Sequence, residues 1–268
     1  MSALLRPMTR AYGLLVRHLL HDKKSRLSEG AFVIEGAKFC LDLIHRQPDA
    51  VLSLVLSSGY LQSEEEAGRQ IRSRLDAPQF TCSDPVFEKL SDVDSPQGVL
   101  AVVRQPRWNE EQVLSQARVL GIYGDQLQDP ANVGTIIRTA AALNLTGVWL
   151  SSDSADWFGP KVVRATAGAV LTLPIFCLQD IHSFSAHDCA IYSAVVPSSE
   201  TVMIGSIRAI PRRLIVAVGN EGRGLAPDVV AASSVRFSIP LARNVESLNV
   251  AATVAISAFY FSQLSAGV

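Results

Sequence analysis

Residues 124–144, GDQLQDPANVGTIIRTAAALN, include two polar side chains, Asn132 and Arg138, that could orient a hydroxyl group or hold an anion. The Asp-Pro pair before Asn132 predicts a turn followed by a helix. Arg138 falls outside the apolar stripe of that helix. Its neighbours one turn away are small, so a polyanion could approach the guanidinium group closely. The alternatives are an ordinary surface arginine at 138 and a simple helix N-cap at 132. The expected buried stripe consists of Val133, Ile137, Ala140 and Ala141.

A glycine-rich loop, Gly219–Gly224, follows the apolar run LIVAVG and holds one amide, Asn220, and one carboxylate, Glu221. Glycines at the end of a strand let a ligand approach the backbone. The order G-x-x-G-x-G lacks a partner acid on a following strand and lacks a Gly-Lys-Ser/Thr sequence, which argues against a Rossmann dinucleotide site and a Walker A loop. A plain turn is the alternative interpretation.

The third segment, FSIPLARNVESLNVAATVAISAFYF at 237–261, combines a short strand, a polar loop and a helix without charged residues. The helix is expected to start near residues 247–249, with Ser247 as a candidate N-cap. Asn249 lies at the edge of an otherwise apolar helix. A buried amide needs a hydrogen-bond partner, which could be a ligand.

The elements that must position these segments alternate between strand and helix, which predicts a mostly parallel sheet in the second half of the chain. Ligands bind beyond the carboxyl ends of parallel strands, so the three segments should meet at one edge. A proline-containing polar stretch at 105–117 predicts a linker between domains at 1–104 and 118–268. The strands expected in the second domain are 119–123, 147–151, a segment around 173–176, 189–196, 214–219 and 235–240.

The last 22 residues, 247–268, contain no charged side chain, and 48% of the whole chain is hydrophobic. This final segment is nevertheless rich in Ala, Ser and Thr, so its transfer into lipid would be weak. It is expected to form a helix buried on all sides. Arg6, Arg10 and Arg17 interrupt the N-terminal apolar positions, which argues against a signal peptide. The expected location is the cytoplasm, and the expected membrane association is none.

Cysteine and histidine spacing gives no metal motif. The four cysteines are too far apart for C-x-x-C pairing and are expected to be reduced core residues. His182 and His187 are expected to lie in a surface loop, and no metal site is predicted.

Basic residues concentrate near the N-terminus, although the formal net charge of the chain is only −1. Residues 1–26 hold six Lys/Arg side chains and one acid, Asp22. One interpretation is a solvated basic helix or arm. The other is a surface that follows a phosphate backbone, with salt-dependent binding.

Three motifs, NVGTIIRTA, GNEGRGL and IPLARNVESLNVA, resemble in order and spacing the signature motifs of the SpoU/TrmH family of SPOUT RNA methyltransferases. The resemblance covers residues 118–262, and KVVRA at 161–165 is similar to a further family segment. The N-terminal half, with FVIEGAKFCLDLI and SPQGVLAVV, is similar to a ribosomal-protein-like substrate-binding domain. The resemblance implies an α/β fold with a C-terminal SPOUT-type parallel sheet and a deep trefoil knot, preceded by a smaller α/β domain.

The resemblance also implies a reaction, namely methylation of a ribose 2′-hydroxyl with S-adenosyl-L-methionine as donor. Guanidinium is effectively always protonated, so Arg138 would stabilise a developing alkoxide and would not act as a simple base. Ribosomal RNA is the expected substrate, with transfer RNA as the alternative. A non-catalytic RNA-binding or assembly protein on the same fold is a third possibility. Family members are homodimers that associate through the knotted domain.

The residues carried over fall into three groups. The catalytic set is Arg138, Asn132, Glu221, Ser247 and Asn249. The cofactor-binding set is Gly219, Asn220, Ile239, Leu241 and Leu248. The RNA-binding set, which also rests on the basic N-terminus, is Arg10, Lys23, Lys24, Arg26 and Arg138.

Overall fold

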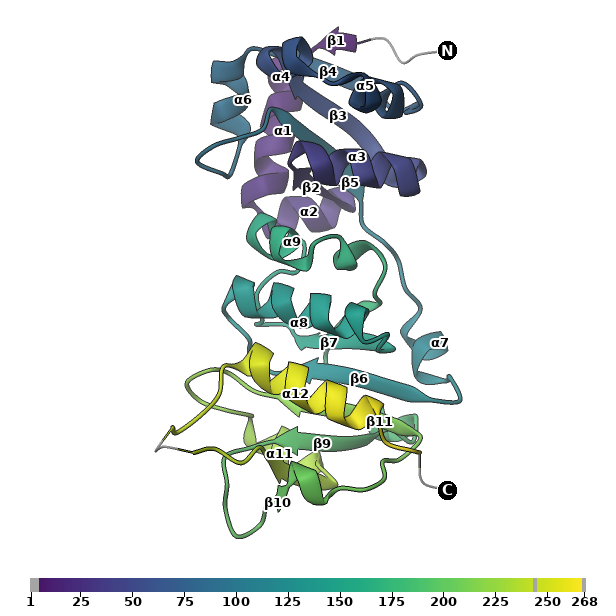
Figure 1. Cartoon of the computed structure of the whole chain (residues 1–268), viewed down its shortest axis with the longest axis vertical. Coiled ribbons are helices and arrows are strands. Elements are labelled where there is room, and N and C mark those ends of the chain that lie inside the picture. The colour runs from purple at the N-terminus through teal and green to yellow at the C-terminus, as the bar shows by residue number, and fades with distance from the viewer. Residues whose placement is uncertain (1–4, 243–244, 267–268) are drawn as a thin grey trace. The chain divides into compact units, whose positions relative to one another are not determined.

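The computed structural model describes residues 5–242 and 245–266, which form two compact units (Figure 1). The first unit contains the chain up to Pro106 together with Phe158–Gly168. The second contains Arg107–Trp157 and the chain from Ala169 onward. The boundary after Pro106 falls inside the stretch predicted to be a linker.

The first unit is built on a five-stranded sheet in the order β1-β4-β3-β5-β2. Strand β5 runs antiparallel to both β2 and β3, and the remaining pairs are parallel. Its strands are β1 Leu5–Pro7, β2 Ala31–Glu35, β3 Val51–Ser57, β4 Gln79–Cys82 and β5 Val99–Arg104. Its helices are α1 Arg10–His21, α2 Lys23–Glu29, α3 Ala37–Arg46, α4 Ser58–Ser63, α5 Glu66–Arg72, α6 Asp84–Leu90 and α9 Pro160–Thr166, with a 3₁₀ turn, η1, at Pro48–Ala50.

Local sequence explains how the basic N-terminal segment becomes two helices. The Thr9 side chain caps α1 by accepting a hydrogen bond from the Tyr12 N–H at 3.2 Å. Asp22 ends α1 and caps α2, accepting from the N–H groups of Lys24 at 3.1 Å and Ser25 at 3.0 Å. Gly30 ends α2 in the left-handed region, with φ of 56°. The apolar side of α1 packs on the sheet through Val16, Leu19 and Leu20.

Helix α9 packs with the first unit, although the sequence assigned its residues to the second domain. Val162 and Val163 are buried, and the Phe158 ring lies 4.8 Å from the Phe32 ring, measured between centroids. Arg164 donates from both terminal nitrogens to Asp92 Oδ2 at 3.2 Å. Contacts distant in sequence therefore determine where this short helix packs.

The second unit is a seven-stranded sheet in the order β10-β12-β9-β11-β6-β7-β8, and every pair is parallel. All six predicted strands form. The seventh, β10, has only two residues, too few to show a period. The strands are β6 Val119–Gly124, β7 Gly147–Ser151, β8 Ile175–Leu178, β9 Ala190–Ala194, β10 Val202–Met203, β11 Arg213–Val218 and β12 Val235–Ser238. The helices are α7 Glu110–Leu114, α8 Pro130–Ala142, α10 Ser183–Ala186, α11 Pro227–Ala232 and α12 Val250–Ser262, with 3₁₀ turns η2 Ala169–Leu171 and η3 Ile204–Ser206.

Helix α7 occupies part of the predicted linker. Its Val113 and Leu114 are buried in the core of the second unit, and Trp149 Nε1 donates to Glu110 Oε1 at 2.7 Å. The segment after Pro106 thus folds onto the sheet, because two apolar residues and one acceptor find partners there.

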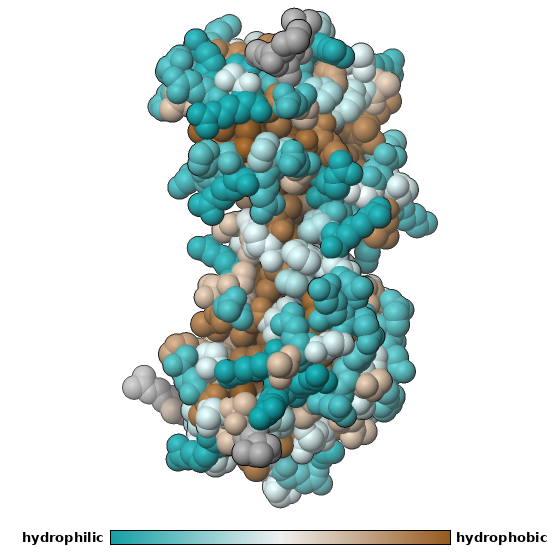
Figure 2. All heavy atoms as spheres, turned by 90° about the vertical axis from the view of Figure 1, so that its right-hand side faces the viewer, coloured by the Kyte–Doolittle hydropathy of each residue, from teal (hydrophilic) through white to brown (hydrophobic). Residues whose placement is uncertain are grey.

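Helix α12 is not buried on all sides within the chain, contrary to the prediction from its lack of charge. Val254, Ala258 and Phe261 are fully buried, whereas Ile256 and Phe259 are 43% and 58% exposed. In the described part of the chain, no helix has the length and apolarity needed to cross a membrane. Figure 2 shows hydrophilic side chains over much of one face of the molecule, with apolar side chains visible between them.

Candidate functional site

Three of the predicted catalytic side chains form one directional chain of hydrogen bonds. Asn249 Oδ1 accepts from the N–H groups of Ala251 at 2.9 Å and Ala252 at 3.3 Å, which turns its Nδ2 outward. That Nδ2 donates to Asn132 Oδ1 at 2.9 Å. Asn132 Nδ2 in turn donates to Glu221 Oε1 at 2.8 Å. Each step fixes the orientation of the next amide, because a carboxylate only accepts and a backbone N–H only donates.

Two helix caps proposed from the sequence differ from those in the structure. Asp129, and not Asn132, caps α8 by accepting from the Ala131 N–H at 2.8 Å. Asn249, and not Ser247, caps α12. Asn132 lies inside the first turn of α8 and is 7% exposed, so its amide is held by side chains far away in the sequence. Ser247 stays in the exposed loop before α12.

The Gly219–Gly224 loop closes on itself through Asn220. The backbone N–H of Asn220 donates to the Gly224 carbonyl at 2.9 Å, and the reverse bond has the same length. Asn220 Oδ1 also accepts from the N–H groups of Gly222 at 3.0 Å and Arg223 at 3.1 Å. A Cβ atom at Gly219 would lie 2.2 Å from the Gly224 carbonyl carbon, so this position requires glycine.

A cavity of about 600 Å³ lies beside this loop, and all five residues predicted to bind the cofactor line it. Glu221 and Ser247 from the predicted catalytic set line it as well. Asn132 and Asn249 do not, but they reach it through Glu221. The cofactor-binding residues that line it are Gly219, Asn220, Ile239, Leu241 and Leu248.

The topology explains why these residues meet. Strands β11, β9 and β12 are adjacent and parallel, so the segments that follow Val218, Ala194 and Ser238 emerge at one edge of the sheet. The segment after β9 also lines the cavity, through Val195, Val196 and Pro197, which were not among the predicted site residues. The strand at 189–196 was predicted, but the sequence does not show that it lies between β11 and β12 in the sheet.

Arg138 lies apart from this cavity. It is exposed on α8 and is absent from the cavity lining, and it has no hydrogen bond or ion pair with any of the residues described here. An ideal helix places it roughly 9 Å along the axis and about 120° around it from Asn132. Within a single chain, the structure therefore does not bring the arginine to the other catalytic candidates.

Arg26 must be removed from the predicted RNA-binding surface. The residue is 5% exposed, and its Nη1 donates to the Leu19 carbonyl at 2.6 Å and the Leu20 carbonyl at 3.1 Å. Its charge satisfies the carbonyl end of α1, where a cation is favourable. Arg10, Lys23 and Lys24 are exposed.

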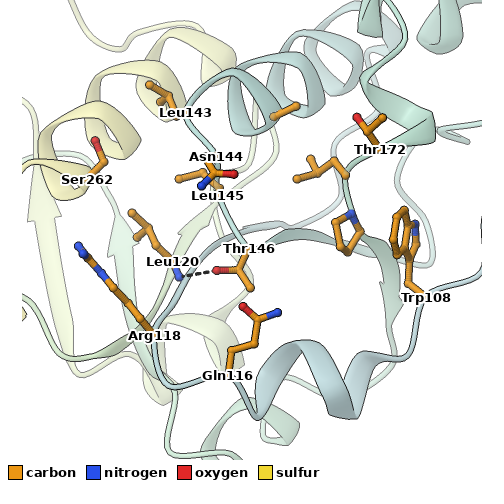
Figure 3. A pocket seen from close by; sticks show the side chains of 13 residues that line it. Trp108, Gln116, Arg118, Leu120, Leu143, Asn144, Leu145, Thr146, Thr172 and Ser262 are labelled. Atoms are coloured by element: carbon orange, nitrogen blue, oxygen red, sulfur yellow. Dashed lines mark hydrogen bonds between the residues drawn. The ribbon is translucent and has the colours of Figure 1, made fainter. Parts of the chain in front are cut away.

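A second cavity, of about 720 Å³, opens at the opposite edge of the second unit (Figure 3). Thr146 and Pro174, which line it, precede strands β7 and β8, and Asn144 follows α8. Figure 3 shows Arg118 and Trp108 on opposite sides of the pocket, with Leu120 and Thr146 between them. None of the predicted site residues lines this larger cavity, so the smaller one is the candidate site.

Known protein families match both halves of this chain. Residues 120–259 match the SpoU rRNA Methylase family, and residues 17–101 match the MRM3-like substrate binding domain. An uncharacterized tRNA/rRNA methyltransferase of Synechocystis sp. is 31% identical, covering 90% of this chain and 88% of its own length. The 23S rRNA (guanosine(2553)-2′-O)-methyltransferase RlmP of Bacillus subtilis is 29% identical, covering 90% of this chain and 92% of its own length.

Solved structures resemble this chain over nearly its whole length. A protein assigned to the TrmH family of RNA methyltransferases, from Porphyromonas gingivalis, aligns with a TM-score of 0.78 and 29% identity over 95% of this chain and 98% of its own. AviRb from Streptomyces viridochromogenes, solved with AdoMet, has the same fold, with a TM-score of 0.81 at 21% identity over 95% of this chain and 98% of its own. Because the SpoU match spans more than half of the sequence and includes all three motifs, the chain belongs to the SpoU rRNA methylase family.

Proposed function

We propose that this chain is an S-adenosylmethionine-dependent RNA methyltransferase that methylates a ribose 2′-hydroxyl of ribosomal RNA. One observation carries the proposal: five residues expected to bind the cofactor line a single cavity, and the Asn249–Asn132–Glu221 hydrogen-bond chain ends at its wall. Cofactor groups and polar side chains for positioning a substrate thus meet at one place.

The cavity suits the methyl donor in size and chemistry. Its volume of about 600 Å³ lies within the range usual for small-molecule sites. Ile239, Leu241 and Leu248 offer apolar contact for a planar ring, and the backbone of the Gly219–Gly224 loop offers fixed polar groups. When bound there, S-adenosylmethionine would supply an electrophilic methyl group on its sulfonium. RlmP, which is similar in sequence, is named as a 2′-O-methyltransferase. AviRb, which is similar in fold, was solved in complex with AdoMet.

The remaining task for the protein is to make a ribose hydroxyl nucleophilic. The new O–C bond forms as the C–S bond breaks, and the hydroxyl proton must leave. Glu221, held by Asn132, would orient the ribose at the cavity wall. Arg138 would stabilise the negative charge on the oxygen and hold a neighbouring phosphate, which could itself take the proton.

We further propose a homodimer in which Arg138 of one subunit completes the site of the other. Two observations support this arrangement. Arg138 lies outside its own cavity, and α12 leaves Ile256 and Phe259 uncovered on one side. An exposed aromatic side chain on a stripe of helical spacing is typical of a subunit interface. The trefoil knot of this family is part of the same proposal, since Ile239, Leu241 and Leu248 line the same cavity as the Gly219–Gly224 loop.

The first unit is proposed to dock the RNA. Arg10, Lys23 and Lys24 are exposed and form no ion pair with another described residue. Arg17 lies two turns after Arg10 on the same exposed side of α1, which extends the basic surface. Such a surface would bind phosphates in a salt-dependent way. The match of residues 17–101 to a substrate-binding domain supports this role.

Ribosomal RNA is favoured over transfer RNA because RlmP, a 23S rRNA enzyme by name, aligns along nearly the whole chain, including the first unit. Every residue of the predicted catalytic set is present in the sequence, which argues against a non-catalytic assembly protein. We expect the enzyme to act in the cytoplasm.

Two measurements test the proposal. Calorimetry at low salt should detect S-adenosylmethionine binding to the purified protein, and no binding would contradict the enzyme assignment. Mapping of 2′-O-methyl groups in total RNA from cells with and without the gene should reveal one lost rRNA position. A lost base methylation would contradict the ribose assignment, and a lost tRNA methyl would redirect the substrate.

A further inference from the structure

Two consecutive residues after strand β6, Asp125 and Gln126, anchor both ends of the Gly219–Gly224 loop. At the start of the loop, Asn220 Nδ2 donates to the Gln126 carbonyl at 2.8 Å. Just after its end, the Ala226 N–H donates to Asp125 Oδ2, also at 2.8 Å. Gln126 itself is held in the left-handed region, with φ of 54°. The loop is therefore fixed from outside as well as by its internal hydrogen bonds.

Burying the Asp125 carboxyl group is energetically unfavourable. The residue is 4% exposed, and burial raises the pKa of its carboxyl group. Its other oxygen, Oδ1, accepts from the Tyr123 hydroxyl at 3.2 Å. An apolar residue would fill this space without the desolvation cost of a carboxylate. The hydrogen bond to the Ala226 N–H offsets part of that desolvation cost.

The Asp125 side chain is linked to the cofactor cavity through Ala226. It does not line the cavity, whereas Gly224 and Leu225, which immediately precede Ala226, do. A shift of the Ala226 backbone would move both of these lining residues. We propose that Asp125 is a positioning residue that holds the cofactor loop in its binding shape before the methyl donor arrives. This inference rests on the proposed function of the cavity.

Calorimetry with S-adenosylmethionine, together with methyl-transfer kinetics, tests the proposal. Asp125→Ala should raise the Kd and the KM for S-adenosylmethionine about tenfold, the size expected when one hydrogen bond to a charged group is lost. The kcat at saturating cofactor should stay within about twofold, because preorganisation by this bond mainly reduces the cost of binding. Asp125→Asn keeps an oxygen for Ala226 and can donate to the Tyr123 oxygen, so it should bind nearly as well as the wild type.

A second variant removes the donor and leaves the carboxylate in place. Ala226 has φ of −61°, which a proline ring accepts, so Ala226→Pro removes the N–H, and its ring also restricts the backbone of Leu225. It should weaken cofactor binding as much as Asp125→Ala, and the double variant should be no weaker than either single one. Asp153→Asn is the matched control, because Asp153 is exposed and influences Asp125 only through its charge.

The calorimetric stoichiometry separates positioning from folding. Irreversibly misfolded protein would lower the number of binding-competent molecules and leave the Kd of the remainder unchanged, whereas a reversible folding defect would lower the urea unfolding midpoint of the unliganded variant. The inference is overturned if Asp125→Ala binds with the wild-type Kd, or if Asp125→Asn is as impaired as Asp125→Ala. It is equally overturned if the double variant shows additive losses. Failure of the wild type to bind S-adenosylmethionine would instead contradict the proposed function itself.

Discussion

Asn132 and Glu221 are 89 positions apart in the sequence, yet Asn132 Nδ2 donates to Glu221 Oε1 at 2.8 Å. This bond joins the start of α8 to the glycine loop after β11. Its direction is set by Asn249, whose own amide is oriented by the first N–H groups of α12. The polar edge of the site thus depends on the N-terminal ends of two helices and on one loop.

Asn132→Ala should reduce methyl transfer by about tenfold to a hundredfold, because loss of a hydrogen bond to a charged group costs about 1.5–3 kcal/mol. Asn132→Asp should be at least as damaging, since it places a second carboxylate against Glu221. Single-turnover rates at saturating cofactor measure the effect. Thr135→Ala, one turn away on the exposed side of α8, is the control. Equal rates for Asn132→Ala and the wild type would remove this bond from the mechanism.

The sequence predicted the strands of the second unit well, because buried parallel strands appear as apolar runs between helices. It also predicted which loops carry polar residues. It could not predict the order of strands in the sheet, and with it the contribution of Val195–Pro197 to the cavity. Arg26 shows a second limit. A basic residue among other basic residues suggests a surface, but here the guanidinium is buried against the carbonyl end of α1. The packing of α9 depends on partners such as Asp92, which no local pattern reveals.

Gly219→Ala should abolish cofactor binding. The added methyl group would lie 2.2 Å from the Gly224 carbonyl carbon and 2.3 Å from the Leu225 nitrogen, both of them backbone atoms. The loop would have to open, and the cavity wall would open with it. Gly205→Ala is the control, because nothing lies within 4 Å of a Cβ atom at that position. Calorimetry with S-adenosylmethionine should show binding for the control and none for Gly219→Ala. Wild-type affinity in Gly219→Ala would mean that the loop does not form the cofactor site.

The raised pKa of Asp125 predicts a pH-dependent difference in stability between the wild type and Asp125→Asn. The folded-state pKa lies above the unfolded value, so the unfolded chain ionises first as the pH rises. The wild type therefore loses stability between the unfolded and folded pKa values, and the asparagine variant does not. The free energy of unfolding of Asp125→Asn, relative to the wild type, should increase from about pH 4 to about pH 7. Urea unfolding at the two pH values measures it, and a difference independent of pH would contradict the prediction.

The uncovered side of α12 should form the proposed dimer interface. Phe259 and Ile256 are spaced three positions apart and are 58% and 43% exposed, so lysine at both positions should convert the dimer to a monomer. Val86, 42% exposed on α6 of the first unit, gives the control substitution Val86→Lys. Sedimentation velocity without RNA distinguishes the two species. A wild type that sediments as a monomer, or a double variant that remains dimeric, would rule out this interface.

Arg138→Ala should abolish methyl transfer with cofactor binding retained, because Arg138 lies outside the cavity. Arg138→Lys keeps the charge but not the two-pronged hydrogen bonding of guanidinium, so it should recover only part of the rate. Arg212→Ala, at an exposed arginine elsewhere in the second unit, should have no effect. Full activity in Arg138→Ala would exclude the residue from the reaction.

Mixing the impaired Asn132→Ala variant with the inactive Arg138→Ala variant determines whether Arg138 acts across the dimer. If each site takes Asn132 from one subunit and Arg138 from the other, a heterodimer of Asn132→Ala with Arg138→Ala contains one site with both residues intact. Co-refolding the two variants at equal concentration should restore about a quarter of the wild-type activity, since half of the dimers would be mixed and each would hold one working site of two. If both residues served the same subunit's site, every site would lack one of them, and the mixture would show only the residual activity of Asn132→Ala.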